Sequence, residues 1–166
     1  MKPSPFLVAD ASRVGELVRK MALQLRGAIG PDASGIVLVG LLRRGHPLAE
    51  RLADVLAEET GRRPPVGALE LKRYDDDLRL LHDRPRLDDA QLDVPVQGRP
   101  VVVVDDVLYS GRTLFRAVEH LDRLEPSAIH SAVLCIREGR ELPVLADAAG
   151  TRLDVGPRGI VDVSIP

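Results

Sequence analysis

The chain has 166 residues, which is enough for one full-sized domain and too few for two. Hydrophobic residues make up 45% and charged residues 29%, the balance of a globular protein that needs no metal or disulfide to hold its core. The net charge of −2 gives no overall attraction to nucleic acid or to a membrane surface, and no apolar run approaches the roughly 18 residues of a membrane span.

The N-terminal residues and the single cysteine indicate a cytoplasmic protein. Only a three-residue apolar stretch, Phe6–Val8, follows the first five residues, which is not the pattern of a signal peptide. Cys135 lies in the apolar run Ser131–Ile136, so we expect a buried structural thiol. One cysteine permits no internal disulfide, which fits a reducing compartment.

Apolar residues at three- and four-residue spacing predict amphipathic helices, and short unbroken apolar runs predict buried strands. The predicted elements, in chain order, are a helix over 14–29, a strand over 35–40, a helix over 47–60, a strand over 66–71, a strand over 101–104, a helix over 113–124 and a strand over 129–136. Asp10 or Ser12 is expected to cap the first helix, which Gly30 ends. Pro47 suits the first position of the second helix, and Gly61 ends it.

Two further stretches carry weaker signals. Residues 72–98 are polar and without periodicity, which is typical of a flexible functional loop. The tail from Glu138 is punctuated by glycine and proline, and 159–165 is predicted as a short edge strand. Taken together, the elements predict an α/β fold with a mainly parallel central sheet flanked by helices. Ligands of such sheets bind at the carboxyl ends of the strands.

The segment that follows the strand 101–104 has the chemistry of an anion site. Ser110, Gly111, Arg112 and Thr113 present backbone N–H groups at the start of a predicted helix, where the helix dipole favours an anion. Gly111 lets the backbone turn and approach closely. The hydroxyls of Tyr109, Ser110 and Thr113 can add donors. The segment therefore predicts a site for a phosphate group.

The adjacent acid pair, Asp105 and Asp106, cannot bind the same phosphate, since like charges repel. Vicinal ribose hydroxyls are a better match for two carboxylates, so the whole segment predicts a sugar-phosphate site. The alternative is that the two acids bind Mg²⁺ directly or cap the helix. The Gly-x-x-x-x-Gly-Lys spacing of a Walker loop is absent.

The segment Val103–Thr113 resembles the signature with which type I phosphoribosyltransferases bind phosphoribosyl pyrophosphate (PRPP). It is most similar to the version found in the PyrR family of pyrimidine operon attenuation regulators, which are also uracil phosphoribosyltransferases. Further matches lie in Val39–Leu52, in Tyr74 and Asp76–Leu78, and in Arg140–Pro143 and Ala146–Asp147, so that the resemblance spans about residues 6 to 154. It implies the type I phosphoribosyltransferase fold with a small hood.

The resemblance also implies how the chain is organised and what the signature does. It implies a single phosphoribosyltransferase domain over 1–166, with 72–98 as a flexible loop and 137–166 as the hood and C-terminal part. The catalytic Asp105 and Asp106 would hold the ribose hydroxyls, and the loop from Tyr109 to Thr113 would cradle the 5′-phosphate.

A second anion site is expected at the end of the first strand, where Arg43, Arg44 and the N–H of Gly45 can meet a diphosphate. A solvated turn with two surface arginines is the alternative on local sequence alone. The resemblance implies the catalytic diphosphate loop, in which type I enzymes often use a non-proline cis peptide.

The acidic segment Tyr74–Asp77 corresponds to the loop that closes over PRPP and excludes water from an oxocarbenium-like transition state. Tyr74, Asp76 and Asp77 are therefore candidate substrate-binding residues, with a solvated charged loop as the alternative. The family pattern has an arginine where this chain has Asp75.

The nucleobase is expected beside Ile136 and Arg137, under the hood. Here the chain departs from the family motif: Ile136 stands in place of an acid, Glu138 in place of a glycine and Gly139 in place of a histidine. The four histidines lack metal-ligand spacing, and no metal-binding residues are predicted.

The predicted activity is the formation of UMP and diphosphate from uracil and PRPP, with Mg²⁺ carried by PRPP. A linked prediction is a regulator that binds pyrimidine leader mRNA in response to UMP or UTP. The alternatives are a catalytically weak or inactive nucleotide sensor and a transferase for another base. By resemblance we expect a homodimer or a higher homo-oligomer.

Overall fold

The computed structural model describes residues 7–30, 35–71 and 92–165 of the chain. Its elements, in order, are α1 (Ala11–Ile29), β1 (Val37–Leu41), α2 (Gly45–Thr60), β2 (Val66–Leu69), β3 (Pro100–Leu108), α3 (Arg112–Asp122), β4 (Ala128–Arg137) and β5 (Ala148–Leu153). The five strands form one sheet in the order β2-β1-β3-β4-β5, and each neighbouring pair is parallel. The α/β fold with a parallel sheet flanked by helices is confirmed.

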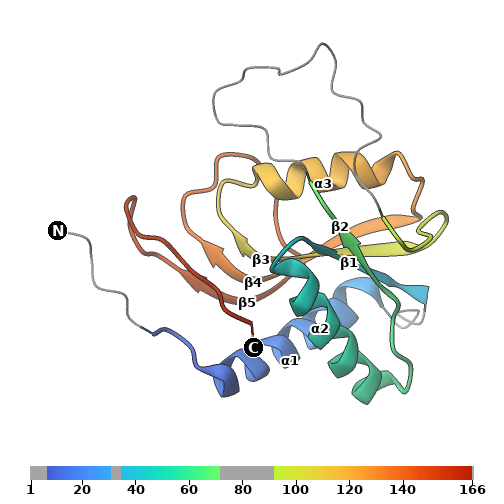
Figure 1. Cartoon of the computed structure of the whole chain (residues 1–166), viewed down its shortest axis with the longest axis horizontal. Coiled ribbons are helices and arrows are strands. Elements are labelled where there is room, and N and C mark those ends of the chain that lie inside the picture. The colour runs from blue at the N-terminus through green and yellow to red at the C-terminus, as the bar shows by residue number, and fades with distance from the viewer. Residues whose placement is uncertain (1–6, 31–34, 72–91, 166) are drawn as a thin grey trace, which may run out of the picture.

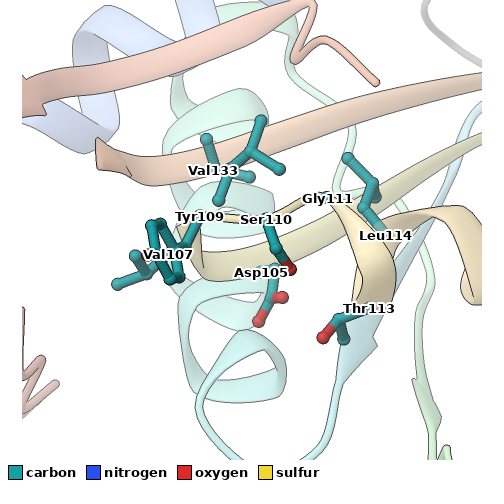
Figure 2. Close-up of a pocket in the computed structure, with 9 residues that line it drawn as sticks. Asp105, Val107, Tyr109, Ser110, Gly111, Thr113, Leu114 and Val133 are labelled. Carbon is teal, nitrogen blue, oxygen red and sulfur yellow. The ribbon is translucent and has the colours of Figure 1, made fainter. Parts of the chain in front are cut away.

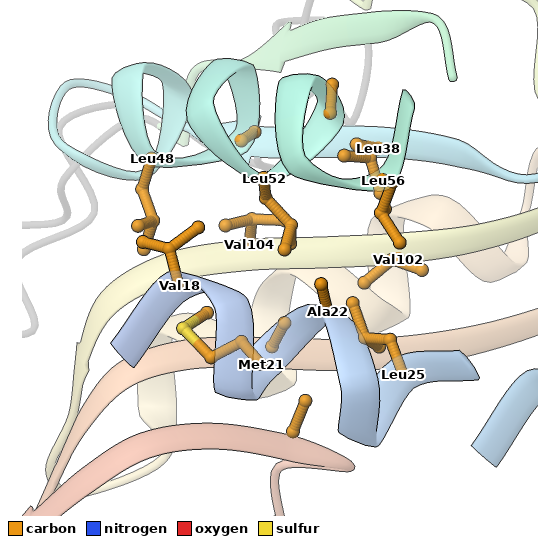
Figure 3. Close-up of a cluster of buried hydrophobic side chains, with 14 of the residues drawn as sticks. Val18, Met21, Ala22, Leu25, Leu38, Leu48, Leu52, Leu56, Val102 and Val104 are labelled. Carbon is orange, nitrogen blue, oxygen red and sulfur yellow. The ribbon is translucent and has the colours of Figure 1, made fainter. Parts of the chain in front are cut away.

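Helices cover both faces of the sheet, with α3 on one side and α1 and α2 on the other (Figure 1). Between α1, α2 and the sheet lies a core that includes Met21, Leu52 and Val104, each fully buried (Figure 3). A second core lies under α3 and includes Val103, Leu114 and Leu121. Because side chains of a strand alternate between its faces, the valines of β3 divide between the two cores.

The structure confirms Asp10, one of the two predicted caps, at the start of the first helix, and the predicted glycines at the ends of the first two helices. The Asp10 carboxylate accepts a hydrogen bond from the Arg13 N–H at 2.8 Å, which satisfies a donor at the start of α1. Gly30, with φ 84°, ends α1, and Gly61, with φ 73°, ends α2. The second helix begins at Gly45 and not at Pro47, so the diphosphate loop predicted at 43–45 runs directly into it.

The tail differs from the prediction. Residues 159–165 form no strand, and the edge position of the sheet is taken by β5 instead. Val163 and Ile165 are partly buried against the core next to α1, so their alternation reflects packing of an irregular segment. β5 was missed because its sequence, AAGTRL, contains small residues in place of the β-branched and aromatic residues that mark strands. Residues 148–153 of the predicted hood segment thus belong to the sheet.

Candidate functional site

The acid pair lies within a strand and not in a loop. β3 continues past Val104 to Leu108, because its pairing with β4 runs on through Val107 opposite Cys135 and Leu108 opposite Ile136. The predicted segment 105–113 is therefore mostly regular structure, and only Tyr109–Gly111 connect β3 to α3. The strand brings both carboxylates to the carboxyl edge of the sheet.

The two carboxylates have different surroundings. Asp105 lines a cavity under the start of α3, whereas Asp106 Oδ2 lies 3.7 Å from Nη1 of Arg44, which precedes α2. The Asp106 N–H donates to Asp105 Oδ1 at 2.9 Å, and the Val107 N–H donates to Asp106 Oδ1 at 2.9 Å. Burial, and then the neighbouring charge of Asp106, raise the pKa of Asp105 to about 7. One strand end thus offers two carboxylates, of which Asp105 keeps its proton to a higher pH than a free aspartic acid does.

The turn between β3 and α3 leaves N–H groups of the helix uncapped. Gly111 has a left-handed backbone, φ 89°, and no side chain caps α3. The Ser110 carbonyl accepts from the N–H groups of Glu141 and Leu142, each at 3.0 Å, which anchors the turn. The Arg112 guanidinium is bonded to Glu141 at 2.8 and 3.1 Å. The backbone N–H of Arg112 donates to Ser110 Oγ at 3.4 Å, so both the side chain and the N–H of Arg112 have partners within the protein.

A cavity of about 170 Å³ lies beside this turn. Its lining includes five residues singled out from the sequence, namely Asp105, Tyr109, Ser110, Gly111 and Thr113. Figure 2 shows the side-chain oxygens of Asp105, Ser110 and Thr113 pointing toward a common space. Donors of an anion site and a carboxylate suited to hydroxyl groups thus share one cavity.

The loop from β1 to α2 lies against the same strand end. The Leu42–Arg43 peptide bond is cis. A Cβ on Gly45 would lie 2.3 Å from the Val104 carbonyl oxygen, so glycine is what allows this close approach to β3. Arg43 and Arg44 are exposed, and Arg44 Nη1 lies 2.5 Å from Asp162 Oδ1. The predicted diphosphate loop and the predicted ribose acids are therefore neighbours.

A second cavity, of about 460 Å³, lies at the ends of β3 and β4 and shares Leu108 and Tyr109 with the first. Its other lining residues are Ile136, Arg137, Glu138, Gly139, Arg140, Leu145, Ala146 and Arg152. The sequence singled out Ile136 and Arg137 for this region but missed Leu145, Ala146 and Arg152. A prediction of β5 would have found Arg152, because that strand places Arg152 at the second cavity.

Arg137 is the most constrained side chain of this cavity. It is only 6% exposed, and its guanidinium carbon lies 3.6 Å from the centroid of the Tyr109 ring. Its Nη2 donates to the carbonyl oxygens of Gly156 and Pro157 at 3.2 and 3.4 Å. Its buried Nε has no hydrogen-bond partner within the described residues. Arg137 thus lines the cavity with a guanidinium that is fixed on one side and has a buried Nε without a partner in the described part of the chain.

The structure explains why glycine stands at position 139, where the family pattern has histidine. A Cβ at this position would lie 2.5 Å from Cε2 of Tyr109. The glycine therefore lets the Tyr109 ring lie over Arg137. Cys135 is buried, as expected, and burial raises the pKa of its thiol to about 11, so it is not a nucleophile at neutral pH.

Three predicted site residues, Tyr74, Asp76 and Asp77, lie outside the described residues, as do Asp75 and most of the predicted loop 72–98. Their roles stay predictions. None of the helices in the described ranges is long and apolar enough to cross a membrane.

Comparison with solved structures identifies the fold. The structural alignment with the hypoxanthine-guanine phosphoribosyltransferase of Bacillus anthracis covers 92% of this chain and 84% of that protein, with a TM-score of 0.69 and 22% sequence identity. The alignment with the hypoxanthine phosphoribosyltransferase of Trypanosoma cruzi covers 92% of this chain and 83% of that protein, with a TM-score of 0.71 and 16% sequence identity. The arrangement of helices around a parallel sheet is the type I phosphoribosyltransferase fold.

Comparison of sequences identifies the family. Residues 8–161 match the phosphoribosyl transferase domain. The bifunctional protein PyrR of Clostridium perfringens is 41% identical over 78% of this chain and 74% of its own length. The PyrR protein of Acetivibrio thermocellus is 37% identical over 95% and 86%, and that of Thermus aquaticus is 40% identical over 79% and 73%. With these matches over most of its length, the chain belongs to the PyrR family of phosphoribosyltransferases.

Proposed function

We propose that the chain is a uracil phosphoribosyltransferase that forms UMP and diphosphate from uracil and PRPP. The observation that carries this proposal is the pair of cavities that share Leu108 and Tyr109. One has uncapped helix N–H groups and Asp105, which suit a phosphorylated ribose. The other lies beside Ile136 and Arg137, which suit a base. A nucleotide spans two such sites.

In this proposal the acids and the uncapped turn position the ribose. Asp105 and Asp106 accept hydrogen bonds from its hydroxyls, and their negative charge stabilises positive charge that develops at the anomeric carbon. Ser110, Gly111, Arg112 and Thr113 hold the 5′-phosphate, mainly through N–H groups at the start of α3. Catalysis then comes from holding the reactants in line, with little proton transfer.

The leaving diphosphate binds to Arg43, Arg44 and the N–H of Gly45 in this proposal. The proximity of Arg44 to Asp106, 3.7 Å, supports a diphosphate site next to the ribose acids. Arginine suits this role because its planar fork binds phosphate oxygens in pairs.

We propose that Mg²⁺ arrives with PRPP. Mg²⁺ in such sites is held by one or two carboxylates together with phosphate oxygens and waters. Asp105 and Asp106 provide hard oxygen ligands of that kind. Within the described ranges no three His, Cys, Asp or Glu side chains gather as a metal site of their own. The bound ion would neutralise charge on the departing diphosphate.

Arg137 supports a base that presents a carbonyl oxygen. A guanidinium can only donate hydrogen bonds, so Arg137 in the cavity wall matches the C4 carbonyl oxygen of uracil, where cytosine has an amino group. Ile136 is half-buried and can pack on the ring. The apolar residue in place of the family's acid thus removes an acceptor from the base site and leaves a donor.

A spectrophotometric assay with uracil, PRPP and Mg²⁺ tests the activity. We expect UMP formation that requires all three components, and no turnover of hypoxanthine or guanine. Activity toward purines alone would overturn the base assignment. A structure with UMP bound is expected to have its phosphate at residues 110–113 and its base beside Ile136, and a UMP molecule seated elsewhere would contradict the site.

Arg137→Gln is expected to lower kcat/KM for uracil about tenfold and to narrow the preference for uracil over cytosine, since a buried hydrogen bond from a charged group contributes roughly 1.5 to 3 kcal/mol. Steady-state kinetics with both bases measures this. Arg123→Gln, at the exposed end of α3, is the matched control and should behave as wild type. Equal losses for both bases would assign Arg137 a purely structural role.

A linked function is regulation through RNA, which the name of the bifunctional PyrR relatives favours. We propose that the chain binds a pyrimidine leader mRNA in response to UMP or UTP, and that it does so as a homodimer or higher homo-oligomer. Gel retardation of such an RNA with and without UMP, over a range of salt, tests the binding. Nucleotide binding by calorimetry without any turnover would instead favour the catalytically inactive sensor.

A further inference from the structure

The C-terminal segment, residues 154–165, is bonded to arginines on two sides of the proposed site. On the diphosphate side, the Asp162 carboxylate lies 2.5 Å from Arg44 Nη1. On the base side, the carbonyl oxygens of Gly156 and Pro157 accept from Arg137 Nη2. The segment contains no helix or strand. It is therefore an irregular stretch of chain connected to both substrate arginines.

Asp162 is the more exposed partner in its ion pair with Arg44. Its neighbour in the segment, Val163, packs against the core beside α1, whereas the Asp162 side chain is 78% exposed. Within the described part of the chain, Arg44 is its one polar partner. Ile165 packs against the same core, so apolar contacts hold this end of the segment next to Asp162 and beyond it. Breaking the ion pair leaves that apolar packing in place.

Arg44 lies between two carboxylates that differ in how easily they can move. Asp106 Oδ2, at 3.7 Å, belongs to β3, and its side chain is only 18% exposed. A diphosphate that approaches Arg44 carries several negative charges and is repelled by a carboxylate already bonded to the same nitrogen. Asp106 is held in the sheet, so Asp162 is the carboxylate that gives way.

We propose that Asp162 occupies Arg44 while the site is empty and that the diphosphate group of PRPP displaces it. This inference rests on the proposed function, because it takes Arg44 as a diphosphate ligand. Asp162 then sets the affinity for PRPP below the value that Arg44 alone would give. PRPP binding frees the segment on the diphosphate side, while Arg137 still holds it on the base side.

Calorimetry of full-length Asp162→Asn with PRPP and Mg²⁺ tests the displacement. Loss of an exposed competing charge is expected to tighten PRPP binding about two- to fivefold, with a matching fall in KM. The affinity for UMP, which has no diphosphate to compete for Arg44, should stay unchanged. Asp54→Asn is the matched control, because Asp54 is also exposed and paired with an arginine, Arg63, at 2.7 Å.

The remaining outcomes overturn the inference in distinguishable ways. Weaker PRPP binding by Asp162→Asn would mean that Asp162 positions Arg44 for the substrate, and unchanged binding would mean that the ion pair has no part in recognition. In an Arg44→Ala background Asp162→Asn should have no effect, and a persistent effect would contradict competition at Arg44. A wild-type chain that binds no PRPP would overturn the proposed function and this inference together.

Discussion

Replacing both Asp105 and Asp106 by asparagine is expected to lower kcat/KM for UMP formation at least about a hundredfold, the scale on which groups aimed at developing charge act. Asparagine keeps the size of the side chain and can still accept a hydrogen bond from a ribose hydroxyl. It lacks the negative charge that would stabilise an oxocarbenium-like transition state. The loss should therefore appear mainly in kcat, with a smaller rise in the KM for PRPP.

A matched double variant, Asp54→Asn with Asp122→Asn, removes two charges from exposed helix positions on α2 and α3. It should retain wild-type kinetics. Far-ultraviolet circular dichroism should be the same for both double variants, since neither changes an apolar core residue. Activity within about threefold of wild type after loss of both site acids would refute the proposed role of the acid pair.

The local chemistry of the site was predictable because it lies in a short segment of sequence. An acid pair, a glycine and a run of hydroxyl residues after four valines indicate an anion site beside a strand end, and the cavity at Asp105, Ser110 and Thr113 has that composition. What local pattern could not supply was the length of β3. Its extension to Leu108 depends on pairing with β4, which is a long-range interaction.

The base side was less predictable for the same physical reason. Arg152 reaches the second cavity only because β5 pairs with β4, and β5 carries few of the residues that favour strands. The contacts of Arg137 with Gly156 and Pro157, and of Arg44 with Asp162, join residues 19, 20 and 118 positions apart. No periodicity or motif encodes such pairs. The predicted strand over 159–165 is therefore an irregular segment, which lies near both of the arginines proposed to bind substrate.

A second large effect is expected on stability: the free energy of unfolding of the ligand-free chain should contain a contribution from Asp105 that is lost as the pH rises. The pKa of Asp105 is raised from 3.8 to about 7 by burial and by the charge of Asp106. Between these values the unfolded chain has released the proton and the folded chain keeps it. Stability therefore falls with rising pH across this window. The contribution is complete below about pH 4 and is lost by about pH 7.

Asp105→Asn, which is neutral at every pH, isolates this contribution. At pH 7 the variant should be more stable than wild type by on the order of 2 to 4 kcal/mol, and near pH 4 the two should be almost equal. Urea unfolding at several pH values between 4 and 8 measures the difference, and Asp54→Asn serves as the control for a lost exposed charge. Parallel curves for wild type and Asp105→Asn would show that Asp105 titrates normally. The same substitution is expected to reduce activity, so stability and catalysis should change in opposite directions. Such a result would indicate that the Asp105 carboxylate serves catalysis and not folding, because its charge destabilises the folded chain.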